Sequence, residues 1–486
     1  MKQLVRNSIT IALTEGVLIL VAIARNKYLA VTIGPEGFGM VNILTSFFGM
    51  IAGLSYGWLT TGTVRFICDS RESGNPGAAR AVVRAALALG ISATAVAGIS
   101  VVLLQNLVRT QIIGVPVPHV AYFSLVGSLA AGCFGLIATN TLQGLMSVRR
   151  SVFGRLLSGF SDITLVVAFV SLMSLDGYFL SIFVSSTVSA GIGWHMVRMA
   201  LPKGDTPANT PTHTVVTPLL RYAGYDAVLG ILTPASHYAQ RRILLHHFPL
   251  DTLGFVQAAS GIMNYVGILQ RASHYTFFPS VCGERDPADL SRKLNEYVRF
   301  SALTSFPLAI AAIMLAEPVV SLLYSRHFAP LSEYVAYFVL AQYVLTLTLS
   351  YQALRVGGGL LRLHLWITVI TQTTWVVIPL VFARRFGVLV IPASLIMGAA
   401  VDFAISSVYW KRCRGVTMGR RETALFFSSL CLVVSAIPVA QARLSWRADF
   451  VAVSLIVLAP LLLPELRAGF AATATAYHGL LGRRRP

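Results

Sequence analysis

The sequence predicts an all-α polytopic membrane protein with about 14 transmembrane helices. Hydrophobic residues make up 55% of the 486 positions and charged residues only 12%, about half the charged fraction of a soluble domain. Stretches without Asp, Glu, Lys or Arg recur at lengths that cross a bilayer core of about 30 Å. They are 86–108, 120–143, 177–197, 252–270, 334–354, 363–383 and 423–442.

The placement of the basic residues predicts the same fold. Threading the chain through a membrane from a cytoplasmic N-terminus puts about 27 of the 38 Lys and Arg residues inside, about 6 outside and about 5 at membrane depth. This asymmetry is typical of a multi-pass protein of the bacterial inner membrane, with both termini cytoplasmic. It also explains the net charge of +19, so we expect membrane lipids, and no nucleic acid, as partners.

Each apolar segment is expected to be a helix, because a backbone exposed to lipid must satisfy its own hydrogen bonds. In chain order the predicted spans are 8–31, 38–62, 84–107, 119–143, 152–174, 177–198, 218–243, 253–281, 298–316, 331–354, 362–383, 388–410, 423–441 and 449–465.

The longest connection divides the predicted spans into two groups. Residues 199–217 are polar and rich in Pro and Thr, which is typical of a flexible linker, here cytoplasmic. We expect a six-helix lobe on each side of it, 1–198 and 218–411, with a central cavity between the lobes. An extra helix pair with a basic cytoplasmic tail, 412–486, follows.

The two lobes show a weak internal repeat. Residues 33–42 align with 248–257 at an offset of 215, and in both segments a tight acidic turn precedes the second helix of the lobe. Six spans put two such repeats in the same orientation, related by an axis along the membrane normal. That is the plan of an alternating-access transporter, and coincidence between two ordinary hairpins is the alternative.

Polar side chains at membrane depth are functional candidates, because burial there is unfavourable without a purpose. Two predicted spans carry them in stripes with helical spacing. The stripe on span 253–281 holds Gln257, Asn264 and Arg271, and the stripe on span 218–243 holds Asp226, His237 and Arg241. We expect both stripes to face the cavity, together with Arg25 of the first span. Snorkelling of the arginines to the headgroups is the alternative.

Carboxylates at membrane depth are candidates for ion coupling. Glu15, Asp226 and Asp402 lie within predicted spans, where each could bind a proton or a sodium ion; structural pairing with an arginine is the alternative. On span 38–62, Gly49 and Gly53 stand four residues apart, with Gly57 four further on, which predicts close helix packing.

The motifs of several enzyme classes are absent. The sequence has no GxxxxGK[ST] phosphate loop, no HExxH, and no Cys/His cluster with metal-ligand spacing. Gly357–Gly359 predicts a tight turn. We therefore expect neither a cofactor nor a metal, and transport driven by a proton or sodium gradient or by the membrane potential.

One run of residues resembles a known family. Ala24-Arg25 through Gly34-Pro35-Glu36-Gly37-Phe38-Gly39 is similar to the first hairpin of bacterial polysaccharide flippases, and Gly62–Ile67 resembles its continuation. These are the O-antigen and exopolysaccharide (Wzx-type) flippases of the multidrug/oligosaccharidyl-lipid/polysaccharide exporter superfamily. Many members have Leu-Tyr where this chain has Met40-Val41. The extra helix pair resembles the lipid II flippase branch instead.

The resemblance implies a transporter rather than an enzyme. Its substrate would be an undecaprenyl-diphosphate-linked oligosaccharide repeat unit, moved from the cytoplasmic to the periplasmic leaflet for surface polysaccharide biosynthesis. Arg25 and Arg271 would hold the diphosphate, since the guanidinium fork suits phosphate oxygens, with Arg241, His237, Asn264 and Gln257 lining the cavity. A polysaccharide polymerase and a chain-length regulator are the expected protein partners.

Three alternatives stay open. A lipid II flippase is one. A cation-coupled multidrug exporter of the same superfamily is another, although it would favour acidic cavity residues, whereas the residues at membrane depth here lean basic. A membrane polymerase or ligase would be expected to have a large periplasmic loop, and the longest outside connection here has only about fifteen residues.

Overall fold

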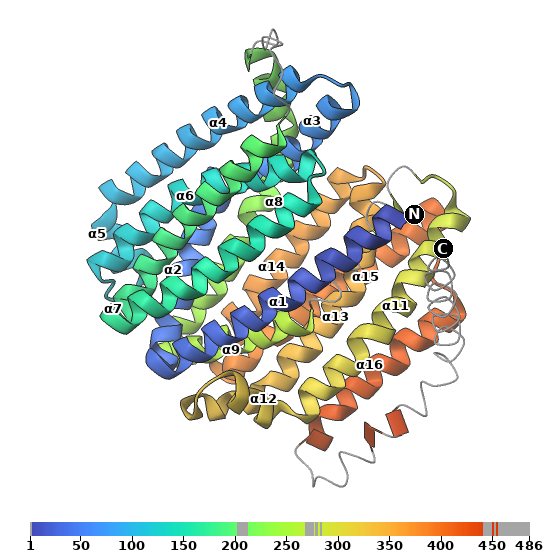
Figure 1. Cartoon of the computed structure of the whole chain (residues 1–486). Coiled ribbons are helices and arrows are strands. Elements are labelled where there is room, and N and C mark those ends of the chain that lie inside the picture. Colours follow the sequence, from blue (N-terminus) through green and yellow to red (C-terminus); the bar gives the residue numbers. More distant parts are fainter. Residues whose placement is uncertain are drawn as a thin grey trace, which may run out of the picture. The chain divides into compact units, whose positions relative to one another are not determined.

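Figure 1 shows the computed structural model, which describes residues 2–201, 212–267, 277, 280–281, 284–440, 450–451 and 453–454. The described part is all-helical, without a strand, as predicted. Eight of its helical segments are long and apolar enough to cross a membrane. The chain is a multi-pass membrane protein. Nearly all of the predicted span 449–465, the basic tail and the middle of the linker at 202–211 lie outside the described residues.

The helices follow the predicted spans closely. The first part of the chain forms α1 (Lys2–Thr32), α2 (Gly34–Ser55), η1 (Gly57–Leu59), α3 (Thr60–Glu72), α4 (Pro76–Leu103), α5 (Gln105–Leu107), η2 (Val108–Ile113), α6 (His119–Gly144) and α7 (Val148–Ala200). The second part forms α8 (Thr212–His247), α9 (Leu250–Val266), α11 (Pro287–Met314), α12 (Ala316–Leu323), η3 (Arg326–Leu331), α13 (Ser332–Gly357), α14 (Leu361–Phe386), η4 (Gly387–Leu389), α15 (Val390–Arg414) and α16 (Arg420–Ala440).

Two helices begin earlier than their apolar segments. The side chain of Asn75 accepts a hydrogen bond from the Ala78 amide (3.0 Å) at the start of α4. Asp286 does the same for the Ala288 amide (3.1 Å) at the start of α11. In both helices a proline occupies the first position, where its missing N–H leaves no bond unmade. The caps therefore extend both helices beyond the apolar runs.

The predicted break between spans 152–174 and 177–198 lies inside α7. Ser174 adopts φ 50° and ψ −123°, which interrupts the helical conformation. Gly177 then packs so closely that a Cβ atom there would overlap the carbonyl oxygen of Phe169. The long segment is thus two helices joined at the predicted position. The turn at Gly357–Gly359 is also confirmed, since α13 ends at Gly357 and Gly359 has φ +71°.

Close helix packing is confirmed at one glycine of α2. A Cβ atom on Gly53 would overlap the carbonyl oxygen of Gly230 on α8. A Cβ atom on Gly49 would meet no atom within 4 Å, and Gly57 lies beyond the end of α2, in η1. The backbone contact of α2 with α8 therefore depends on Gly53.

The chain forms two compact units. Unit 1 comprises Met1–Gly261, Val320–Leu331 and Leu361–Gly398, and unit 2 comprises Ile262–Val319, Ser332–Leu360 and Ala399–Pro486. In unit 1, α6 packs along α7, and α2 and α14 both pack on α8. In unit 2, α11 packs on α13 and α16. The linker at 199–217 falls inside unit 1, so the division into two lobes at this linker stays a prediction.

Candidate functional site

Arg241 lies at the centre of a buried polar cluster in unit 1. Its side chain is held by three neutral acceptors: Nε donates to Asn42 Oδ1 (3.1 Å), and Nη1 donates to the His237 carbonyl (3.1 Å) and to Gln240 Oε1 (3.4 Å). Arg241 is 9% exposed and Asn42 is 1% exposed. No carboxylate pairs with Arg241 among the side chains that the structure describes. The site therefore holds a buried guanidinium whose charge no described carboxylate neutralises.

Other polar side chains of α8 bond to neighbouring helices of unit 1. The Gln240 amide donates to the Trp375 carbonyl of α14 (3.0 Å) and to the Ser394 hydroxyl of α15 (3.2 Å). The Gln372 amide donates to the Thr233 hydroxyl at 3.1 Å. These bonds hold α8 against α14 and α15 at the level of Thr233 and Gln240.

Part of this cluster has hydrogen-bonding capacity that the described residues do not use. His237 stacks at a tilt on Trp375, with ring centroids 5.5 Å apart. The buried atoms His237 Nδ1, Gln372 Oε1 and Trp375 Nε1 have no hydrogen-bond partner within the described chain. Unsatisfied buried polar atoms are unusual in proteins and mark places where a polar ligand group can gain contacts.

Arg25 is already paired. On α1, its Nη1 lies 2.7 Å from Asp162 Oδ2 of α7, and the two side chains are 31% and 27% exposed. The sequence places both residues at membrane depth but does not pair them. Binding of an anion by Arg25 would therefore compete with Asp162.

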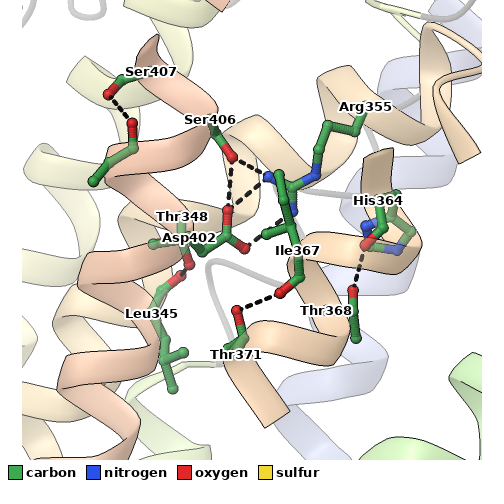
Figure 2. Close-up of polar contacts among 11 residues, drawn as sticks. Leu345, Thr348, Arg355, His364, Ile367, Thr368, Thr371, Asp402, Ser406 and Ser407 are labelled. Atoms are coloured by element: carbon green, nitrogen blue, oxygen red, sulfur yellow. Dashed lines mark hydrogen bonds and ion pairs between the residues drawn. The ribbon is translucent and has the colours of Figure 1, made fainter. Parts of the chain in front are cut away.

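Asp402 is paired as well, with an arginine that the sequence reasoning did not include in the site (Figure 2). Arg355 Nη1 lies 2.6 Å from Asp402 Oδ1, and Nη2 lies 3.0 Å from Oδ2. The Ser406 hydroxyl donates to Asp402 Oδ1 at 2.8 Å and also contacts Arg355. Arg355 is the basic residue in the last turn of α13. A carboxylate in an apolar span requires a cation nearby, which predicts a basic partner for Asp402 but not which residue it is.

The other predicted residues are distributed over both units. Gln257 is half-buried on α9 in unit 1, and Asn264 is exposed further along the same helix, in unit 2. Glu15 and Asp226 belong to α1 and α8, but their side chains are outside the described part of the structure, and Arg271 lies wholly outside it. The assignment of all these residues to one cavity stays a prediction.

The sequence matches a family of polysaccharide biosynthesis proteins and a relative named as a transporter. A family model described as polysaccharide biosynthesis protein matches residues 28–333, which is more than half of the chain. A Shigella flexneri protein named "Putative O-antigen transporter" is 20% identical over 336 residues, covering 67% of this chain and 78% of that protein.

Solved structures with the same fold are also transporters. The lipid II flippase MurJ in an inward closed conformation superposes with a TM-score of 0.67 at 10% identity, covering 94% of this chain and 99% of MurJ. An inward-facing multidrug transporter of the MATE family superposes with a TM-score of 0.64 at 15% identity, covering 84% and 95%. The chain therefore belongs to the polysaccharide biosynthesis protein family and has the fold of the multidrug/oligosaccharidyl-lipid/polysaccharide exporter superfamily, as the first hairpin indicated.

Proposed function

We propose that this protein flips an undecaprenyl-diphosphate-linked oligosaccharide from the cytoplasmic to the periplasmic leaflet of the bacterial inner membrane by alternating access. The observation that carries the proposal is the buried guanidinium of Arg241, whose partners among the described side chains are all neutral. The family match and the name of the Shigella flexneri relative support the same substrate class. No covalent bond changes in such a step, so the protein acts as a transporter and not as an enzyme.

The physical requirement of the step is to shield a diphosphate and several sugars from hydrocarbon, where unsatisfied polar groups are strongly unfavourable. An arginine suits the diphosphate because it donates paired hydrogen bonds to phosphate oxygens and keeps its charge. To bind a phosphate, Arg241 would exchange hydrogen bonds with neutral groups, whereas Arg25 would have to break its ion pair with Asp162. Among the described candidates, Arg241 is therefore the first contact for the diphosphate, and Arg25 and Arg271 are proposed as later ones.

The described carboxylates disfavour the drug-exporter alternative. A pump for cationic drugs gains from buried carboxylates that are free to bind them, but Asp162 and Asp402 are each paired with an arginine. A lipid II flippase is the second candidate, because the superposition with MurJ covers 94% of the chain. Both candidate lipids carry a diphosphate and differ in the attached glycan. An experiment that identifies the transported glycan therefore decides between the two functions.

Energy coupling is part of the proposal. Protonation of Asp402 would remove its charge from Arg355 and weaken the two guanidinium bonds, which gives a proton a way to bias the conformation of unit 2. Asp226 and Glu15 are the other candidates for a proton or sodium ion, and the membrane potential alone is the remaining source. A polysaccharide polymerase and a chain-length regulator are the proposed partners, with no cofactor.

Deletion of the gene in its own host tests the function. The expected result is loss of a surface glycan together with accumulation of its lipid-linked repeat unit. Accumulation of lipid II with cell lysis would favour the second candidate. Drug sensitivity with a normal surface glycan would contradict both.

Complementation with variants tests the site. Arg241→Ala, at wild-type level in the membrane, should fail to restore the glycan, and Arg241→Lys should restore it partly, because lysine keeps the charge and loses the fork. Arg414→Ala is the matched control, since Arg414 is exposed at the end of α15. Full restoration by Arg241→Ala would show that this arginine does not contact the substrate.

A further inference from the structure

The internal repeat reappears in unit 1 as a pair of exchanged backbone contacts. At the offset of 215, Pro35 corresponds to Leu250 and Gly39 corresponds to Gly254. A Cβ atom on Gly39 would overlap the carbonyl oxygen of Leu250, and one on Gly254 would overlap the carbonyl oxygen of Pro35. The same contact is thus made twice with the roles of the two repeats exchanged, which is the signature of a two-fold axis.

Side chains reinforce the contact between these two segments, which lie at the starts of α2 and α9. The Asn42 amide donates to the Leu253 carbonyl at 3.0 Å. Phe38 and Phe255, one from each segment, both pack edge-on against Phe328 of η3, with ring centroids 5.2 and 6.0 Å apart. Because Gly39 and Gly254 allow the two backbones to touch, this contact, called the seam below, has no room for an added methyl group.

Two basic residues also make reciprocal contacts between the two halves of the sequence. Lys27 and Arg242 are equivalent at the same offset. Lys27 Nζ donates to the carbonyls of Ser321 (2.6 Å) and Tyr324, in the connection after the third predicted span of the second half. Arg242 Nε donates to the Ile112 carbonyl (3.0 Å), in the corresponding connection of the first half. Each half therefore donates one cation to backbone carbonyls of the other half.

We propose that these four contacts form a latch that closes one face of the transporter and that must open and re-form in each cycle. The latch is defined by Gly39, Gly254, Lys27 and Arg242. The proposal rests on the alternating access proposed above, and the predicted topology assigns this face to the periplasm. Neutral carbonyl acceptors suit such a device, because their bonds to the cations are exchanged readily for bonds to water when the face opens.

The test places spin labels on Glu36→Cys and Asp251→Cys, which are equivalent positions beside the seam, after the five native cysteines are replaced by serine. The label separation is measured in lipid vesicles without substrate. The wild-type latch should give mainly a short separation. Gly39→Ala and Gly254→Ala should each raise the ratio of long to short separations by about tenfold, because one added methyl overpacks a closed interface.

Matched variants control the test. Gly49→Ala, on the same helix as Gly39 but with open space around its Cβ position, should leave the separation unchanged. Lys27→Met and Arg242→Met should shift it in the same direction as the glycine variants, by about threefold each, since each loses hydrogen bonds without a steric clash. If a glycine variant fails to reach the membrane, these two variants decide the outcome.

The outcomes separate the latch from the function. An unchanged separation in both the glycine variants and the charge variants would overturn the latch, whatever the substrate proves to be. A shifted separation in a protein that does not flip lipid-linked oligosaccharide would leave the latch standing and reject the proposed function.

Discussion

Removing one member of the Arg355–Asp402 ion pair should destabilise the protein far more than removing both. The Arg355 side chain is 1% exposed and that of Asp402 is 15% exposed. Arg355→Met leaves the carboxylate without its two guanidinium bonds, and Asp402→Leu leaves a buried guanidinium. Each single change should lower the free energy of unfolding by about 3–5 kcal/mol, whereas an apolar pair of similar volume is close to neutral.

A double-mutant cycle measures this difference. The free energy of unfolding by SDS in mixed micelles is compared for the wild type, the two single variants and the double variant. Because each single change costs about 3–5 kcal/mol and the double change is close to neutral, the expected coupling energy is about 6–10 kcal/mol. The exposed pair Arg292–Asp289, with side chains 64% and 41% exposed, is the control and should couple by no more than about 0.5 kcal/mol. Equal coupling energies for the two pairs would refute the claim that burial makes the Arg355–Asp402 pair important for stability.

The double variant also separates folding from coupling. If Asp402 serves only to hold α15 against α13, Arg355→Met with Asp402→Leu should fold and still transport. If Asp402 carries the coupling proton, the same protein should fold but lose its dependence on the proton gradient. Transport that keeps its full gradient dependence would remove Asp402 from the coupling mechanism.

Two further predictions rest on local contacts and one rests on the predicted topology. Gly53→Ala should lower the free energy of unfolding by about 1–3 kcal/mol through overpacking, while Gly49→Ala, with open space around it, should leave that free energy within about 0.5 kcal/mol of the wild type. The side-chain hydrogen bond from Lys293 lowers the pKa of Glu284, so the stabilisation from this carboxylate is present at neutral pH and is lost as the pH falls through the lowered pKa; Glu284→Gln should flatten stability curves measured between about pH 3 and pH 7. A reporter fused at Arg150 should give a cytoplasmic signal, and a periplasmic signal there would contradict the predicted topology.

The sequence was sufficient for the helices because the membrane permits few alternatives. Apolar runs without charges must satisfy their backbone bonds internally, so spans such as 119–143 could be placed within a few residues. The early start of α11 was missed because hydropathy ignores caps, although Asp286 and Pro287 are a helix-start signal that local reading could have found. The two compact units could not be predicted from the sequence, because each unit combines segments that are far apart in the chain.

The candidate site could be predicted only by residue type. The unfavourable burial of charge pointed to Arg25, Arg241 and Asp402 as special, but not to their partners. Pairing of Asp402 with Arg355 depends on which helices meet, at what depth and with what rotation, and one sequence does not contain that information. The repeat at an offset of 215 was the exception, since it predicted the equivalence that the contacts of Gly39 and Gly254 display.

Flipping by the purified protein tests the central claim most directly. The protein is reconstituted into vesicles with the lipid-linked repeat unit isolated from the deletion strain, and the fraction of that lipid reaching the opposite leaflet is followed over time. Transfer should be faster than in protein-free vesicles, should be lost in Arg241→Ala and should be kept in the control Arg414→Ala. Equal transfer with and without the protein, under an imposed proton or sodium gradient and membrane potential, would contradict the proposed function.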